Sequence, residues 1–239
     1  MCLTTAGDGV YATGAHDGGI ALHDLGANST SVLVPGSALS TIPEPSSASG
    51  QAKWDDFSVS DDMTLVLLQT QTRQVYRHSS KAVYVIYDVR ARSTAPLIDS
   101  RAAAATVVGG EAGDTSVSTA VFAPKGHALA YVRDNDLYIV GSPGGADHAR
   151  RVTSDGSKTV FNGVPDWIYE EEVRRRRRRL SHQSASMADR ELVVTAQVLA
   201  DDKALWWAPD GSKLAFLRFD ETEVPEFEYP IVRLCCFSQ

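Results

Sequence analysis

The sequence predicts an all-β fold, and three observations predict it. Short segments rich in β-branched, aromatic and leucine residues recur along the 239 residues, separated by Gly, Asp, Asn, Ser and Pro clusters. Outside the region around residues 174–179, no long stretch has the 3.6-residue period of an amphipathic helix. Two patterns also repeat at intervals of tens of residues, as in propellers and solenoids. The predicted strands are residues 20–25, 65–70, 83–89, 128–132, 136–140 and 213–219.

The first repeat is an apolar segment that contains an aspartate and is followed by an apolar pair. Ala-Leu-His-Asp-Leu (21–25) and Val-Ile-Tyr-Asp-Val (85–89) carry it, and their aspartates are 64 residues apart. Each aspartate precedes its apolar pair, 33–34 or 97–98, by the same interval. The spacing predicts two structural units of equal design.

The second repeat is a hairpin pattern. Residues 122–132 (Phe-Ala-Pro-Lys-Gly-His-Ala-Leu-Ala-Tyr-Val) match residues 207–217 (Trp-Ala-Pro-Asp-Gly-Ser-Lys-Leu-Ala-Phe-Leu), and 59–68 is a degenerate copy. An incoming strand, a tight turn with Pro and Gly, and an outgoing strand fit this order. The repeat therefore predicts one hairpin in each blade of a β-propeller.

The spacing of the hairpin turns indicates an insertion. The turn positions Asp61, Pro124 and Pro209 are 63 and then 85 residues apart, and removing residues 174–198 brings the second interval to 60. We interpret this segment as a retained intron in the gene model or a disordered loop within the domain. The tail 232–239 also departs from the pattern, and we interpret it as a second aberrant segment.

Charge excludes some classes of partner. The 23 basic and 30 acidic residues give a net charge of −7, which argues against non-specific binding of nucleic acid. Six consecutive arginines, 174–179, are the exception. If the segment is translated, they form a solvated loop or a localisation signal.

Membrane and metal signals are missing from the sequence. No run approaches the roughly 18 apolar residues of a membrane span, and the N-terminus lacks the pattern of a signal peptide. Cys2, Cys235 and Cys236 lie at the termini, so they predict neither a disulfide framework nor a metal site. We expect no cofactor and no metal.

The densest group of chemically active residues is Asn-Gly-Val-Pro-Asp-Trp-Ile-Tyr-Glu-Glu-Glu-Val (162–173). Its three glutamates, 170–172, repel one another, so holding them together requires a cation or open solvent. The preceding Trp-Ile-Tyr (167–169) should anchor the segment in the core. Adjacent side chains point apart on a strand, so two of these glutamates converge only from a helical or turn conformation.

With this motif the chain resembles the β-propeller of dipeptidyl peptidase IV and its fungal dipeptidyl aminopeptidase relatives. The resemblance runs from about residue 9 to 231 and implies a partial propeller domain over 1–231, about four blades of an eight-bladed propeller. A non-enzymatic propeller that binds a protein partner is the alternative. The segments that carry the resemblance are 76–79 (Tyr-Arg-His-Ser), 121–138, 166–173, 204–211 and 220–225.

The resemblance implies a serine exopeptidase that releases N-terminal dipeptides, preferentially after Pro or Ala. Its nucleophile lies in a Gly-x-Ser-x-Gly turn of an α/β-hydrolase domain. None of the 18 glycines here begins that motif, so we expect the hydrolase domain to be absent and this chain to be inactive alone. We predict no catalytic residue.

The resemblance also implies substrate-binding residues. Glu171 and Glu172 correspond to the pair that binds the amine of the peptide N-terminus, and Arg77 to the arginine that contacts the substrate carbonyl near it. Family members often form homodimers, membrane-anchored in the secretory pathway with a lumenal or extracellular domain. The glycosylation sequon at Asn28 is compatible with that location.

Overall fold

The computed structural model confirms the all-β prediction. Within the residues that it describes, helical structure is limited to a 3₁₀ turn, η1 (Gly36–Leu39), and a helical turn at 169–170. Strands and turns make up the remainder. The described residues are 4–6, 9–39, 42, 54–76, 78–98, 114–143, 149–166, 169–170 and 202–225.

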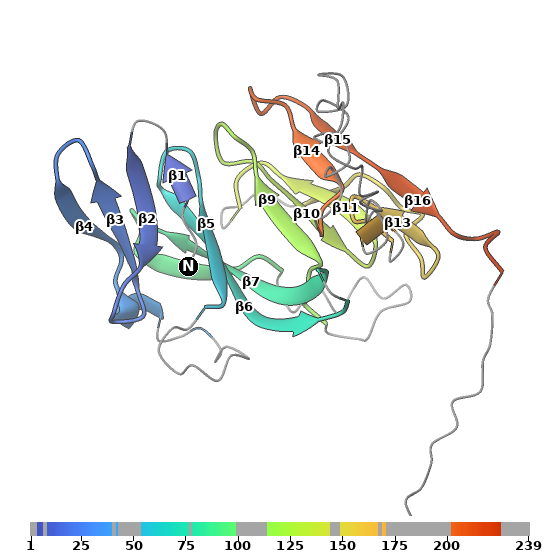
Figure 1. The fold of residues 1–239 in the computed structure, drawn as a ribbon, viewed down its shortest axis with the longest axis horizontal. Coiled ribbons are helices and arrows are strands. Elements are labelled where there is room, and N and C mark those ends of the chain that lie inside the picture. Colours follow the sequence, from blue (N-terminus) through green and yellow to red (C-terminus); the bar gives the residue numbers. More distant parts are fainter. Residues whose placement is uncertain are drawn as a thin grey trace, which may run out of the picture.

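Three four-stranded antiparallel sheets follow one another in chain order, and each strand pairs with the next one along the chain (Figure 1). The first contains β1 (Thr4–Ala6), β2 (Val10–Gly14), β3 (Ile20–Asp24) and β4 (Ser29–Val34). The second contains β5 (Asp56–Val59), β6 (Leu65–Gln74), β7 (Ser80–Asp88) and β8 (Ser93–Pro96). The third contains β9 (Thr119–Phe122), β10 (Leu129–Arg133), β11 (Asp136–Val140) and β12 (Arg150–Arg151).

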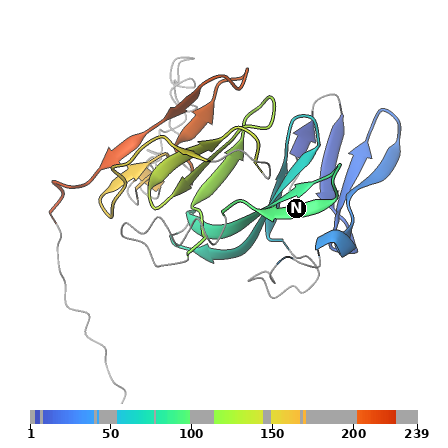
Figure 2. The ribbon, with the colours of Figure 1, turned by 180° about the vertical axis from the view of Figure 1, so that it is seen from behind.

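The last strands form two smaller sheets. These strands are β13 (Val160–Asn162), β14 (Leu205–Trp207), β15 (Leu214–Phe216) and β16 (Arg218–Asp220). β14 pairs with β15, and β13 pairs with β16, so the chain returns to a strand that it left more than 50 residues earlier. Figures 1 and 2 show this region at the end of the molecule opposite β1–β4.

The predicted strand 213–219 is wrong in one respect, because it is two strands. Leu217 separates β15 from β16: its N–H donates to the carbonyl of Ala204 (2.9 Å), and its carbonyl accepts from the N–H of Gly163 (2.9 Å). Because of these non-local bonds, the chain leaves β14, the partner of β15, and continues beside β13, the partner of β16. The predicted strand 136–140 is present with the same bounds, and the other four are present with shifted ends.

The repeated hairpins are confirmed as β5–β6, β9–β10 and β14–β15, all antiparallel. Their turns require a left-handed residue, which is Gly126 (φ 76°) in one and Gly211 (φ 72°) in another. In the degenerate copy Met63 adopts this conformation (φ 55°). The turn geometry is therefore kept even where the glycine is not.

Apolar clusters fill the spaces between neighbouring sheets. β6 begins with four consecutive buried residues, 65–68, because alternate side chains point to opposite faces and a sheet lies against each. Val66 and Leu68 belong to the cluster with the first sheet, whereas Leu65 and Leu67 belong to the cluster with the third. A third cluster, around Leu137, joins the third sheet to β14 and β15.

A side-chain hydrogen bond also crosses each junction between sheets. Two of the three donors are tryptophan rings, which offer a polar N–H at the edge of a large apolar surface. The three bonds are Trp54 Nε1 to the carbonyl of Gly18 (2.9 Å), His127 Nε2 with Asp62 Oδ2 (2.8 Å), and Trp207 Nε1 to the carbonyl of Val121 (3.2 Å).

Several predicted features lie outside the described residues. They include the insertion 174–198 and the tail 232–239. Asn28 of the sequon is described, and it lies in an exposed turn between β3 and β4 with φ 46°. Among the described segments, no helix has the length and hydropathy needed to cross a membrane.

Candidate functional site

A short helical turn begins at Asp166, at the start of the glutamate motif. The carboxylate of Asp166 accepts the N–H of Tyr169 (2.8 Å), and its carbonyl accepts the N–H of Glu170 (2.9 Å). This is the arrangement of a helix N-cap, which Asp favours. The motif therefore enters a helical conformation at the point where its glutamates begin, as the convergence of adjacent side chains requires.

Tyr169 contacts the last sheet from this turn, but it is 44% exposed, so the prediction that it anchors the motif in the core is wrong. Its ring lies 5.0 Å from that of Phe219, centroid to centroid. Phe219 is a buried residue of β16. The aromatic contact attaches the acidic turn to the strand that returns to β13.

Glu170 connects the acidic turn to a distant part of the chain. Its Oε1 accepts the backbone N–H groups of His78 (2.6 Å) and Ser79 (2.7 Å), which are 92 and 91 residues away. The residue is only 4% exposed. Its Oε2 and the Oγ of Ser79 are buried, and neither has a hydrogen-bond partner among the described residues. A buried carboxylate therefore holds two neighbouring amides of the second sheet.

The amides belong to the turn that joins β6 to β7. The carbonyl of Ser79 accepts the N–H groups of Val75 (2.9 Å) and Tyr76 (3.3 Å) and so closes the turn. The Gln74 side chain donates to the carbonyl of Tyr76 (2.6 Å). Ser79 thus uses its carbonyl to close the turn and its N–H to attach the turn to Glu170.

The predicted site residues Arg77, Glu171 and Glu172 lie outside the described residues. Their neighbours in the chain are described. Arg77 directly precedes His78, and Glu171 directly follows Glu170. Consecutive Cα atoms are about 3.8 Å apart. The two segments that carry the predicted residues therefore meet through Glu170 and the turn at 78–79.

Two further carboxyl groups were not predicted to belong to this site. Glu221, which follows β16, lies close to the carboxyl group of Asp166. Burial and the negative charge of Asp166 raise the pKa of Glu221. Glu170, the first glutamate of the triplet, was assigned no role. Its hydrogen bonds come from amides 91 and 92 residues away, which no local pattern indicates.

A cavity of about 180 Å³ lies beside the acidic turn. Its walls include Tyr76 and Ser79 from the β6–β7 turn, and Val164 and Pro165 from the segment before the acidic turn. Two cationic and two acidic residues also line it: Lys81, Lys158, Asp202 and Glu221. The cavity thus has one wall from each of the segments that carry the predicted residues. The described residues contain no group of His, Cys, Asp and Glu suited to hold a metal ion.

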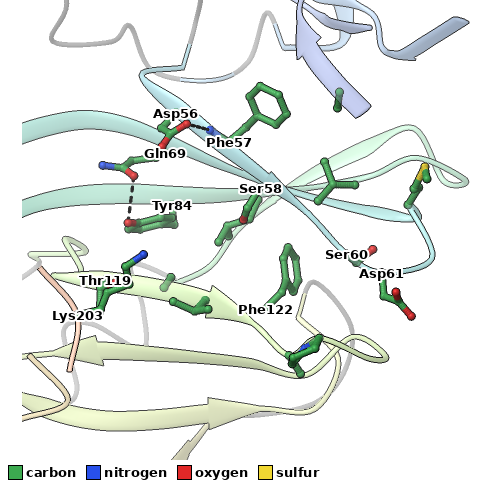
Figure 3. A pocket seen from close by; sticks show the side chains of 18 of the residues that line it. Asp56, Phe57, Ser58, Ser60, Asp61, Gln69, Tyr84, Thr119, Phe122 and Lys203 are labelled. Atoms are coloured by element: carbon green, nitrogen blue, oxygen red, sulfur yellow. Dashed lines mark hydrogen bonds between the residues drawn. The ribbon is translucent and has the colours of Figure 1, made fainter. Parts of the chain in front are cut away.

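A larger cavity, of about 600 Å³, separates β5 from β9 (Figure 3). Inside it the Tyr84 hydroxyl donates to Gln69 Oε1 (3.2 Å), and burial raises the pKa of Tyr84. Asp202 lines this cavity as well as the smaller one. Tyr76 and Ser79, from the turn next to Arg77, line the smaller cavity and not the larger one, so we place the candidate site at the smaller one.

The sequence family described as the dipeptidyl peptidase IV (DPP IV) N-terminal region matches residues 60–186 and 183–234. The chain belongs to this family. The resemblance inferred from the acidic motif is therefore confirmed.

Curated fungal relatives of this DPP IV N-terminal region extend the match. The chain is 32% identical to a probable dipeptidyl peptidase 4 of Neosartorya fischeri, over 95% of its own length and 23% of the relative. It is also 32% identical to the dipeptidyl peptidase 4 of Trichophyton rubrum, over 93% of its length and 22% of the relative. The chain thus spans about a quarter of the length of these relatives.

A solved structure shows the same fold as this DPP IV N-terminal region. Dipeptidyl peptidase 4 of Porphyromonas gingivalis superposes with a TM-score of 0.65 and 24% identity, over 98% of this chain and 27% of that one. The antiparallel sheets described above correspond to its propeller region.

Proposed function

We propose that this chain supplies the substrate-gating part of a dipeptidyl peptidase IV-like serine peptidase. In this proposal Glu171 and Glu172 bind the N-terminal amine of a peptide, and Arg77 contacts the substrate carbonyl near that amine. The whole enzyme then releases N-terminal dipeptides, with the nucleophile supplied from outside the 239 residues.

One observation carries the proposal. The bonds from His78 and Ser79 to Glu170 join the turn that contains Arg77 to the turn that leads into Glu171. Groups that touch the amine and the nearest carbonyl of one peptide have to lie within a few ångströms of each other. This junction brings their described neighbours in the chain, His78 and Glu170, into contact across more than 90 positions of sequence, and so supports the proposal.

The chemistry of the acidic turn favours a cation as the ligand. The carboxyl groups of Asp166 and Glu221 lie close together, and Glu170 to Glu172 follow Asp166 within a few residues. A peptide ammonium next to two carboxylates forms charge-assisted hydrogen bonds and relieves their repulsion. An N-acylated peptide has no such cation, so binding of the amine by Glu171 and Glu172 implies a requirement for a free amine.

Titration of the purified chain with the dipeptide Ala-Pro and with N-acetyl-Ala-Pro tests the proposal. We expect the free amine to bind at least about tenfold more tightly, as one charge-assisted hydrogen bond provides. Glu171→Gln and Glu172→Gln should each reduce that preference. Binding should also weaken above about pH 8, where the peptide amine loses its proton.

Equal affinities for the two peptides, or an unchanged preference in both variants, would contradict the amine site. In that case the binding of a protein partner by a non-enzymatic propeller becomes the better hypothesis. Circular dichroism of each variant is the control for folding.

A further inference from the structure

We infer that Glu170 is a positioning residue for substrate binding, because its side chain fixes the turn that contains Arg77 against the turn that leads into Glu171 and Glu172. This inference rests on the proposed function and adds a residue to it. The three glutamates then have two different tasks: the first sets the geometry of the site, and the other two contact the ligand.

The first argument is the number and length of the bonds. One oxygen of Glu170 accepts two consecutive backbone N–H groups, at 2.6 and 2.7 Å. Hydrogen bonds to a charged acceptor are shorter and stronger than neutral ones. Because both donors are main-chain groups, the contact fixes the path of the turn and not only the position of one side chain.

The second argument is that each end of this connection is itself held. The turn is closed at Ser79, whose carbonyl accepts two N–H groups. The Glu170 end is held by the Asp166 cap and by the contact between Tyr169 and Phe219. A side chain between two anchored turns transmits their relative position, whereas one attached to a loose segment would not.

The third argument concerns the second carboxylate oxygen, Oε2, which is buried and has no partner among the described residues. The connection therefore uses one of the two oxygens, at the reach of a glutamate side chain. Glutamine keeps an oxygen at that reach without the charge. Aspartate keeps the charge but is shorter by one methylene, about 1.5 Å. These two substitutions separate position from charge.

Three variants of the full chain, Glu170→Ala, Glu170→Asp and Glu170→Gln, test the inference. Amide hydrogen exchange at His78 and Ser79 and the affinity for Ala-Pro are measured for each. We expect Glu170→Ala and Glu170→Asp to lose the protection of both amides and to bind Ala-Pro about tenfold more weakly. Glu170→Gln should keep the protection and stay within about threefold of the unchanged chain.

Asp88 provides the matched control. Its Oδ1 also accepts two backbone N–H groups, from Arg90 and Ala91, both at 2.8 Å. Asp88 lies at the opposite end of β7 from Ser80, about 26 Å along the strand. We expect Asp88→Ala to expose the amides of its own turn and to leave the affinity for Ala-Pro unchanged.

The outcomes separate this inference from the proposed function. If Glu170→Ala loses amide protection but retains full affinity, the positioning role is wrong and the amine site stands. If Glu170→Asp binds normally and Glu170→Gln does not, the charge acts directly on the ligand, and positioning is again wrong. If the unchanged chain shows no preference for the free amine, the proposed function fails and the inference with it, while amide exchange still decides whether Glu170 holds the turn.

Discussion

The second and third sheets differ from the region of β13–β16 in how they use their polar groups. In the two sheets each strand pairs with its neighbour in sequence, and side chains such as Asp88 cap local turns. In the β13–β16 region the strands have three residues each, and among the described residues they form two pairs, where each four-stranded sheet has three. Polar side chains of this region, such as Glu170, reach distant segments. Glu170 and Asn162 belong to this region, and each has a buried polar atom without a partner among the residues that the structure describes.

The difference indicates that the regular sheets mainly determine stability and that the irregular region mainly determines binding. A regular antiparallel sheet satisfies its backbone internally, so its stability depends on packing between sheets. The β13–β16 region has fewer internal bonds, which leaves backbone and carboxyl groups to make contacts elsewhere. We expect substitutions in the regular sheets to affect stability, and substitutions in the irregular region to affect binding.

The largest expected effect is on stability, in the third sheet. Leu129 on β10 is fully buried in the cluster between the second and third sheets. Leu129→Ala should lower the free energy of unfolding by about 3 kcal/mol, through lost burial and the cavity left behind. Urea denaturation followed by tryptophan fluorescence measures it. The folded fraction should bind Ala-Pro with unchanged affinity. A loss of affinity in Leu129→Ala would contradict the expectation that the regular sheets affect stability and not binding.

Gly163, which follows β13, is expected to have a smaller effect on stability than Leu129. Unlike Leu129, it should also affect binding. Gly163 has φ 78°, and an added Cβ would lie 3.1 Å from Val132 Cγ2. Gly163→Ala should cost about 1 kcal/mol because of the left-handed backbone. The strain should also displace the segment leading to Asp166 and weaken Ala-Pro binding. Calorimetric titration measures the binding, and an unchanged affinity would place the site outside the influence of this segment.

The smallest effect concerns the contact between the second and third sheets at Asp62. Burial alone would raise the pKa of Asp62, but hydrogen bonds from Thr64, His127 and Ser60 hold it well below its usual range. A carboxyl with a depressed pKa contributes stability above its unfolded value, about 3.9, and loses it as the pH falls further.

Asp62→Asn should therefore reduce stability by less than about 1 kcal/mol at pH 7, since both partners are partly exposed. The difference from the unchanged chain should shrink as the pH falls below 4, which thermal melting at several pH values measures. Asp210→Asn is the matched control, because Asp210 caps the corresponding turn at Ser212. An equal effect of both substitutions would mean that the contact with His127 contributes nothing.

Local features of the fold could be predicted from the sequence. The hairpins of 122–132 and 207–217 are encoded by residues within a few positions of one another, and the structure contains both. The break at Leu217 could not be predicted, because it depends on bonds to Ala204 and Gly163. Patterns in a sequence report local preferences, whereas such bonds depend on tertiary packing.

The candidate site was predicted from the resemblance of a motif to a family, and not from the local conformational preferences or charges of its residues. The acidic run 170–172 alone is compatible with an exposed turn, and its resemblance to the family gave it a function. The task of Glu170 became visible only when the turn at 78–79 was seen against it. Its neighbours in sequence contain no donor pattern that would indicate this contact.

The contact between Glu170 and Ser79 also has a consequence for the order of folding. It closes a loop of about 90 residues that contains β7 to β13, and closing such a loop has an entropic cost that local hairpins avoid. Contacts of this sequence separation form late, after the hairpins that bring their ends together. The two turns thus meet only once the intervening sheets have assembled, and a partly folded chain presents two separate charged loops.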